Sequence, residues 1–291
     1  MGLEQVAPSS CRGALQEHGS EPVEPQVSTA WLLLFRSTRA LPFAPCMNSI
    51  PPHVLHLART ACLVESRAHL YSGYLVGVFP RWSQTFERWG AEEETHGASL
   101  REWLAREDPR FDFERHFADY LARVPYHPEG TGSVYGSPQG ELVARCFVEA
   151  MAATYYQALG TGSPALRPLC RKLAADEARH FTMFRRLLEI LRAEEGSRPL
   201  EAARVMFQRL RALDDEQILF ASWCVRGDAN GGPFVLAEES KRYRAMMWRL
   251  YRPEHIRFVA TLSLQTLGLP VAAPKLAWLS EAVHGALSPR E

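Results

Sequence analysis

Residues 89–97 read Trp-Gly-Ala-Glu-Glu-Glu-Thr-His-Gly, and residues 174–180 read Ala-Ala-Asp-Glu-Ala-Arg-His. Both stretches contain Glu-x-x-His, which on a helix places a carboxylate and an imidazole one turn apart on the same face. The motif alone is weakly specific, since Glu281 and His284 form a third copy to which we assign no chemistry. What surrounds the first two copies decides the predicted fold.

Each of these two motifs follows another glutamate at the same distance. Glu65 lies 28 residues before Glu93 (93 − 65), and Glu149 lies 28 residues before Glu177 (177 − 149). If each pair sits at equal height on two antiparallel helices, the turns fall near residues 79 and 163. Phe-Pro at 79–80 and Gly-Thr-Gly-Ser-Pro at 160–164 are both turn sequences. The spacing therefore predicts two helical hairpins, each with Glu on its first arm and Glu-x-x-His on its second.

The apolar residues around the motifs follow the heptad spacing of a left-handed helical bundle. On the arm that begins near residue 81, steps of four and three residues connect Trp82, Phe86, Trp89, Glu93, His96, Leu100 and Trp103. On the helix expected at about 164–192, such steps connect Leu166, Cys170, Leu173, Glu177, His180, Phe184, Leu187 and Leu191. The glutamates and histidines of both motifs therefore occupy core positions.

The two preceding glutamates also fall on inward faces. Pro51-Pro52 opens a helix whose stripe of small residues contains Val54, Ala58, Ala61, Cys62, Glu65, Ala68 and Ser72. A carboxylate on such a face costs several kcal/mol unless it is neutralised or bound. A helix at about 139–159 turns inward Leu142, Cys146, Glu149, Ala152 or Ala153, and Tyr156. His69 is a candidate for an additional ligand or for a partner behind the ligands, but a histidine at this position is more often only hydrogen-bonded at the rim. Glu92 and Glu94 are expected to be solvated charges.

The rest of the chain reads as helical too. Residues 108–137 are expected to cross between the hairpins, with one amphipathic helix over 113–123, because hairpins paired in parallel need a long crossover. Further helices are expected at about 199–213, 216–224, 236–250, 253–267 and 273–287, with a glycine-rich break at 227–232. We find no strand hairpin, phosphate loop, nucleophile elbow or dinucleotide motif. The predicted fold class is all-α: a four-helix bundle with a long crossover plus C-terminal helices from about residue 197.

The amino-acid composition bears on which partners the protein binds and on the cellular compartment in which we expect it. Lys+Arg and Asp+Glu balance at 33 each, which gives no basis for binding nucleic acid, and 46% hydrophobic residues suffice for a sizeable core. No apolar run approaches the roughly 20 residues that span a bilayer, and we identify no signal peptide. The six cysteines are scattered without Cys-x-x-Cys, as expected for thiols in a reducing cytosol. We therefore predict a cytoplasmic protein without membrane insertion.

Residues 1–46 differ from the rest, because they are rich in Pro, Ser, Glu and Gly without helical periodicity. Two interpretations stay open. The segment is a disordered extension, or translation starts at Met47 and the preceding residues are an over-extended reading. In both cases residues 47–291 form the helical domain.

The two hairpins would bring together four carboxylates and two imidazoles, those of Glu65, Glu93, His96, Glu149, Glu177 and His180. This mostly hard, oxygen-rich set suits iron or manganese and argues against structural zinc or Cu(I). Four carboxylates also balance the charge of two divalent ions. Without metal they repel one another and must take up protons. The sequence therefore predicts a centre of two iron ions, with manganese as the alternative.

The motif helices resemble those of the soluble acyl-[acyl-carrier-protein] desaturases, a family of ferritin-like di-iron proteins. Residues 86–97, with Leu100 and Trp103-Leu104 after them, are similar to that family's W-x-x-E-E-x-x-H-G helix, and residues 173–180 are similar to its I-A-A-D-E-x-x-H helix. Phe-Val-Glu-Ala at 147–150 falls where the family has its third ligand helix. With a looser similarity at Tyr251 and at 268–269, the resemblance covers roughly residues 50–280.

The resemblance implies a homodimeric di-iron oxidoreductase. Such an enzyme takes electrons from a ferredoxin-like donor, activates O₂ and desaturates an acyl chain carried on acyl carrier protein. It also implies terminal ligation by Glu65 and Glu149, bridging by Glu93 and Glu177, and one histidine per metal. Trp89 and Asp176 are expected to lie just behind the ligands, and so is Ala152, which stands where the family usually has Thr. The acidic carrier would dock on basic residues, either those between Lys241 and Arg257 or Arg167, Arg171, Lys172 and Arg179.

Other functions stay open at this point. A di-iron oxygenase or oxidase could hydroxylate or N-oxygenate a small or carrier-bound metabolite. Ferroxidase or peroxide-handling bundles, and a bundle without enzymatic activity, are further alternatives. Thr95, where the family usually has Arg, and Ala152 leave the predicted metal ligands intact but open the question of substrate and reaction.

Overall fold

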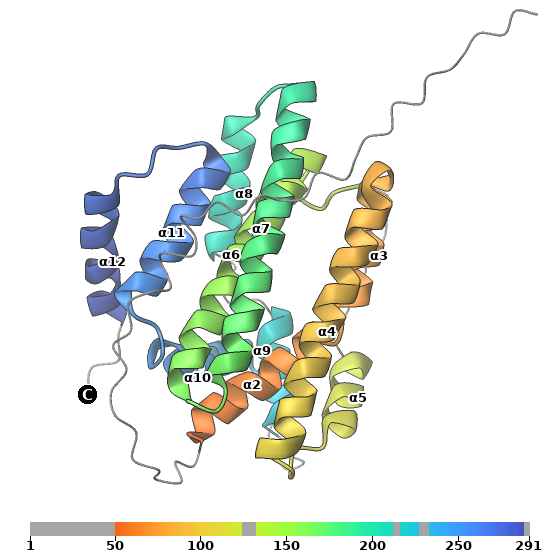
Figure 1. The fold of residues 1–291 in the computed structure, drawn as a ribbon, viewed down its shortest axis with the longest axis vertical. Coiled ribbons are helices and arrows are strands. Elements are labelled where there is room, and N and C mark those ends of the chain that lie inside the picture. Colours follow the sequence, from red (N-terminus) through yellow and green to blue (C-terminus); the bar gives the residue numbers. More distant parts are fainter. Residues whose placement is uncertain (1–49, 124–131, 212–215, 227–232, 288–291) are drawn as a thin grey trace, which may run out of the picture. The chain divides into compact units, whose positions relative to one another are not determined.

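The computed structural model of the protein describes residues 50–123, 132–211, 216–226 and 233–287. The predictions for residues 1–46 and for the glycine-rich break at 227–232 lie outside these ranges. Within them all regular structure is helical, so the all-α prediction is confirmed (Figure 1). The elements are α2 (Pro52–Glu65), α3 (Ala68–Val78), η1 (Pro80–Trp82), α4 (Ser83–Glu107), α5 (Phe113–Arg123), α6 (Pro138–Gly162), α7 (Arg167–Glu195), α8 (Pro199–Arg211), α9 (Glu216–Val225), α10 (Leu236–Trp248), α11 (Pro253–Leu267) and α12 (Ala273–Leu287).

Both predicted turns are where the glutamate spacing places them. The first arm ends at Val78 and α4 begins at Ser83, while α6 ends at Gly162 and α7 begins at Arg167. The helix predicted within the crossover matches α5, and the predicted C-terminal helices match α8 to α12 within a few residues. Among the described helices, none combines the length and the apolar character needed to cross a bilayer.

The second arms of the two hairpins lie side by side and antiparallel. Near one end of this pair the Phe86 ring stacks on Phe184, with centroids 5.9 Å apart. Towards the other end the Trp103 indole N–H donates to the Ala165 carbonyl at 3.3 Å. Because α6 and α7 are joined by a tight turn and are themselves antiparallel, α4 and α6 run in the same direction. The connection from α4 to α6 must therefore travel the length of the bundle, as the long crossover predicts.

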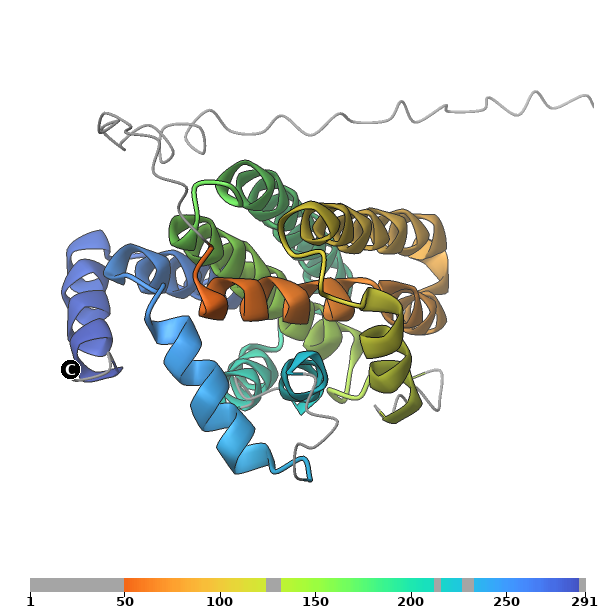
Figure 2. The same ribbon diagram turned by 90° about the horizontal axis from the view of Figure 1, so that it is seen from below.

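The predicted core stripes are buried. On α4 and α7 the buried side chains include Phe86, Trp89, Glu93, His96, Leu100, Trp103, Cys170, Leu173, Glu177, His180, Phe184, Leu187 and Leu191. The C-terminal helices cover the bundle: α8 and α11 pack on α6, and α9 packs on α2 and α5. Figure 2, from below, shows α2 crossing the middle of this arrangement and α10 and α12 lying outside it.

The first arm is not the single helix predicted from its stripe, because it breaks immediately after Glu65. The Ser66 hydroxyl donates to the Cys62 carbonyl at 2.7 Å, a back-bond that bends helices. The Arg67 N–H bonds to the carbonyl of Val64 instead of continuing the α-helical pattern. Gly97 of α4 lies directly against this break, and a Cβ there would come within 2.8 Å of the Ser66 nitrogen. Glu65 is thus the last residue of α2.

Candidate metal centre

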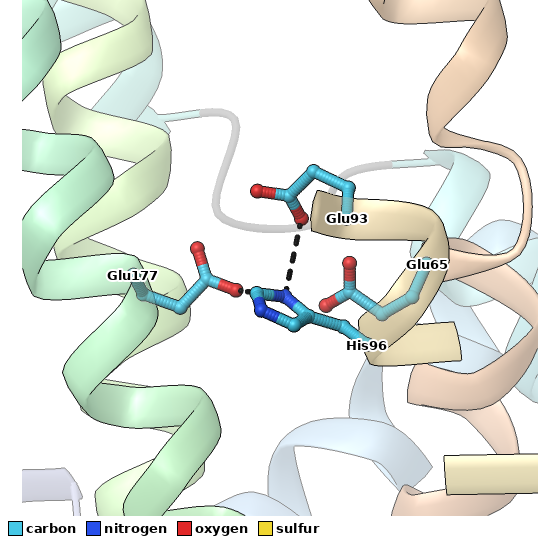
Figure 3. A group of neighbouring side chains, drawn as sticks. All are labelled: Glu65, Glu93, His96 and Glu177. Carbon is cyan, nitrogen blue, oxygen red and sulfur yellow. Dashed lines mark ion pairs between the residues drawn. The ribbon is translucent and has the colours of Figure 1, made fainter. Parts of the chain in front are cut away.

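The six predicted ligands converge between the two hairpins. Glu65 comes from α2, Glu93 and His96 from α4, Glu149 from α6, and Glu177 and His180 from α7. Their ligand atoms form two groups, Glu65 with Glu93, His96 and Glu177, and Glu93 with Glu149, Glu177 and His180; within each group the atoms lie within 4.8 Å of one another. Figure 3 shows the first group pointing into one shared space.

Two glutamates belong to both groups. Glu93 and Glu177 are each placed to contact two ions, whereas each of the other four side chains belongs to one group only. Each group therefore offers two shared carboxylates, one further carboxylate and one imidazole. This division follows from the positions of the ligand atoms.

The inner atoms of the cluster lack partners. His96 Nδ1, His180 Nδ1, Glu93 Oε1 and both carboxylate oxygens of Glu177 are buried without a hydrogen bond. His180 Nδ1 lies 2.8 Å from Glu93 Oε1, and His96 Nδ1 lies 3.1 Å from Glu177 Oε1, but neither contact is aligned as a hydrogen bond. Unpaired buried polar atoms are costly. A cluster of such atoms from Glu and His side chains fits divalent metal ions.

The outer nitrogen of each histidine faces a carboxylate, by a hydrogen bond at His180 and by an ion-pair contact at His96. His180 Nε2 lies 2.9 Å from Glu92 Oε2, and His96 Nε2 lies 3.4 Å from Asp176 Oδ2. A carboxylate on one ring nitrogen places a proton there and leaves the other nitrogen as the metal ligand. Both imidazoles therefore present Nδ1 to the cluster.

Glu92 was wrongly predicted to be a solvated charge. It precedes Glu93 as Asp176 precedes Glu177, so both motifs read acid-Glu-x-x-His. Each acid braces the histidine of the other motif, because α4 and α7 cross antiparallel with the motifs at the same height. The repeated acid was a signal in the sequence, but its partner becomes visible only when the two helices are placed together.

His69 lies neither among the ligands nor directly behind them. It is exposed and lies 3.3 Å from the equally exposed Glu94, because the break after Glu65 prevents the α2 stripe from continuing inward on α3. Ala152 is half-buried and supplies only a methyl group. Trp89 is buried beside the site as expected, and its ring stands edge-on to His180 with centroids 6.5 Å apart.

Tyr156 is a site residue that the sequence reading placed inward without giving it a role. Its hydroxyl donates to Glu65 Oε1, and the side chain is 1% exposed. Tyr156 lies two turns after Glu149 on α6, so the heptad step from a ligand marked its position. Burial, followed by the Glu65 charge, raises the pKa of this phenol, which keeps it a hydrogen-bond donor.

The metal-free cluster favours bound protons. Burial, and then the nearby Glu93 carboxylate, raises the pKa of Glu65 well above its ordinary value. Burial also raises the pKa of Glu149 strongly, although the His180 imidazole, 3.6 Å from this carboxylate, opposes the shift. Burial alone would lower the pKa of His96, but the Glu177 and Glu93 carboxylates outweigh it and raise this pKa to about 11. Protons thus supply the positive charge that metal ions would bring.

The third Glu-x-x-His copy takes no part in the cluster. Glu281 is exposed, and His284 Nε2 lies 3.0 Å from the Tyr251 carbonyl oxygen. The prediction that this copy carries no chemistry agrees with its position on α12.

The chain was compared with known protein families and with curated proteins. No family model matches it, and no curated protein matches it. The functional conclusions therefore depend on the site itself and on the motif resemblance.

Proposed function

We propose that the cluster holds two iron ions and that the protein is an O₂-dependent di-iron oxidoreductase. The observation that carries this proposal is the pair of four-residue groups that share Glu93 and Glu177. Oxygen-rich ligands with one imidazole per ion suit iron, with manganese as the alternative metal. Helical bundles that carry dinuclear carboxylate centres use the same set of a Glu from each of two helices and Glu-x-x-His from each of two others.

When bound, two ferrous ions would supply the electrons and the open coordination positions that dioxygen activation requires. The protein's own residues hold that centre in place. Glu92 and Asp176 fix the imidazoles from behind, and Tyr156 fixes the Glu65 carboxylate. Trp89 and Phe184 form an aromatic wall beside His180, with ring centroids 5.5 Å apart, and this wall keeps water from that side of the cluster.

For the substrate, we propose an acyl chain carried on acyl carrier protein, which the enzyme desaturates. The support is the resemblance of residues 86–97 and 173–180 to the acyl-[acyl-carrier-protein] desaturases. The same resemblance supports a ferredoxin-like donor, a homodimer and a cytoplasmic location as proposals. Ala152, which lacks the hydroxyl that this family usually has there, favours the second candidate, a di-iron oxygenase or oxidase of a small or carrier-bound metabolite.

The two candidate binding surfaces for the carrier differ in how many of their basic residues are already paired with acids. On α7, two of the four basic residues, Lys172 and Arg179, already pair with Asp176 at 3.3 and 2.7 Å. On α10 and α11, Lys241 and Arg257 are exposed. We therefore propose that the carrier docks on the basic residues between Lys241 and Arg257.

Metal analysis tests the first part of the proposal. Protein reconstituted anaerobically with Fe(II) is expected to bind two irons per chain, and Glu93→Ala or Glu177→Ala is expected to lose the pair because each removes a shared carboxylate. Glu281→Ala is the matched control and should retain both irons. Retention of two irons in both Glu93→Ala and Glu177→Ala would overturn the assignment.

The reaction is tested by lipid mass spectrometry. The chain is expressed in a host that lacks unsaturated-fatty-acid synthesis, with Glu177→Ala as the inactive control. New double bonds that require Glu177 support the desaturase. An iron-loaded protein that produces hydroxylated or N-oxygenated products, and no unsaturated acyl chains, would establish the second candidate instead.

A further inference from the structure

Arg179 joins the two carboxylates that brace the histidines. Its Nη1 donates to Asp176 Oδ1 at 2.7 Å, and its Nη2 donates to Glu92 Oε2 at 2.7 Å. The guanidinium therefore closes a continuous path from the outer nitrogen of His96 through both acids to the outer nitrogen of His180. The acids lie on different helices, Glu92 on α4 and Asp176 on α7, and one arginine connects them.

We propose that Arg179 is a positioning residue that orients both imidazoles and so couples the two metal subsites. This inference rests on the proposed function, because it assigns Arg179 a role toward the metal pair. A guanidinium carries its N–H donors in a fixed planar arrangement, so Arg179 can hold two carboxylates at once in a way that a point charge cannot. With both acids fixed, each imidazole keeps its Nε2–H outward and its Nδ1 lone pair toward the cluster.

Ordinary surface ion pairing does not account for this arrangement. The side chains of Arg179 and Glu92 are 44% and 40% exposed, and pairs so exposed contribute little to stability. This ion pair instead affects a buried side chain, because Glu92 contacts the outer nitrogen of His180, whose side chain is only 4% exposed. Removal of Arg179 is therefore expected to change the metal site far more than the stability of the fold.

The two subsites should depend on Arg179 unequally. Asp176 is only 18% exposed and has a second cation, Lys172, at 3.3 Å. Glu92 is more exposed, and the ion pairs described for it involve only Arg179 and His180. Without Arg179 its carboxylate is free to turn toward solvent. We therefore expect the His180 subsite to weaken more than the His96 subsite.

The variant Arg179→Lys distinguishes the effect of positioning the two acids from the effect of positive charge alone. Arg179 reaches the two acids with two different nitrogens. The single ammonium of Arg179→Lys cannot reproduce that span, so it restores the net charge without restoring both contacts. If charge alone mattered, Arg179→Lys would behave as the wild type does.

The test measures stepwise Co(II) affinity by competition with a chelating dye in the full chain, for the wild type, Arg179→Gln, Arg179→Lys and Arg185→Gln. Arg185 on α7 pairs with Glu189 in a similarly exposed contact and is the matched control. Loss of a group that orients a ligand typically costs 10–100-fold in metal affinity. We expect this loss for one ion in Arg179→Gln, a smaller loss in Arg179→Lys, and no change in Arg185→Gln. Affinities of Arg179→Gln within twofold of the control would overturn the proposal.

Nitrogen-15 NMR of labelled histidines supplies a readout that does not depend on activity. In the Zn(II)-loaded and metal-free wild type, slowly exchanging Nε2–H signals are expected for both His96 and His180. The His180 signal should be lost in Arg179→Gln and retained in Arg185→Gln. If the wild type binds no metal pair, the proposed function fails, and the metal-free spectra still decide whether Arg179 positions the imidazoles. Unchanged signals in Arg179→Gln would refute that role.

Discussion

Removal of metal should leave a protein whose stability falls steeply with alkaline pH. In the metal-free state, the pKa of His96 is about 11 because the Glu177 and Glu93 carboxylates outweigh burial, and the pKa of His180 is also raised far above the ordinary 6.5. The unfolded chain loses both imidazolium protons near pH 6.5, while the folded chain keeps them. The stabilising contribution is therefore complete below pH 6.5 and is lost as pH rises towards the folded-state values.

The size of the effect follows from the number of protons. Between pH 7.5 and 8.5 the imidazoles of His96 and His180 in the folded metal-free protein hold two protons that the unfolded chain has lost, and protons held by Glu65 and Glu149 add to this number. Each proton contributes about 1.4 kcal/mol per pH unit, so the free energy of unfolding should fall by at least about 2.7 kcal/mol over this interval. This is a large share of the roughly 5–15 kcal/mol that stabilises a typical domain.

Urea unfolding followed by circular dichroism at pH 7.5, 8.0 and 8.5 measures this slope. The metal-loaded protein is the first control, since its histidines bind metal through Nδ1 and hold no extra proton. The comparison with the metal-loaded protein also removes the contribution of buried thiols, because Cys62 and Cys146, whose pKa values burial raises to about 12, are not among the proposed ligands. His96→Gln should reduce the slope by about 1.4 kcal/mol per pH unit, whereas His284→Gln should keep the slope of the wild type. Equal slopes with and without metal would refute the charged cluster.

Three further predictions concern other parts of the chain. A protein that begins at Met47 is expected to fold and bind metal as the full chain does, because the sequence of residues 1–46 offers no helical periodicity and no expected ligand. Circular dichroism and metal analysis test this prediction. Loss of the fold or of either ion would contradict it. Gly97→Ala is expected to lower the free energy of unfolding by about 1–3 kcal/mol, because the new Cβ would press on the backbone at the break after Glu65, within 2.8 Å of a nitrogen. Gly285→Ala, which meets nothing within 4 Å, is its control, and equal urea midpoints would refute the close approach. Charge reversal at Lys241 and Arg257 is expected to raise KM for a carrier-bound acyl substrate and to weaken its salt dependence, with peroxide-driven oxidation of a free small molecule unchanged. An unaltered KM would exclude this dock.

The positions of the ligand helices and their turns could be predicted from the sequence because equal spacings between glutamates and heptad steps determine them. Equal spacing between Glu65 and Glu93, and between Glu149 and Glu177, set the turns and the height of the ligands. Heptad steps then set which faces are buried, since this period is shared by every helix of a bundle. These features depend on helix geometry alone, and that geometry can be inferred from the periodicity of residues along one amino-acid sequence.

What the sequence could not predict depends on contacts between helices. The break after Glu65 needs the close approach of Gly97, and it removes His69 from the interior. The pairing of Glu92 with His180 joins residues 88 positions apart and requires the relative height of α4 and α7. The hydrogen bond from Tyr156 to Glu65 similarly crosses between hairpins. Periodicity gives the direction of a side chain but not the identity of its neighbour.

The exchange of bracing acids between the motifs has a consequence for the order of folding. Neither hairpin contains a complete subsite, because the acid behind each histidine comes from the other hairpin. Contacts between residues so far apart in sequence form after local helices do, since a long loop must close first. If the cluster binds metal as proposed, we expect capture only after the hairpins have docked, so that metal stabilises an assembled bundle and does not nucleate its folding.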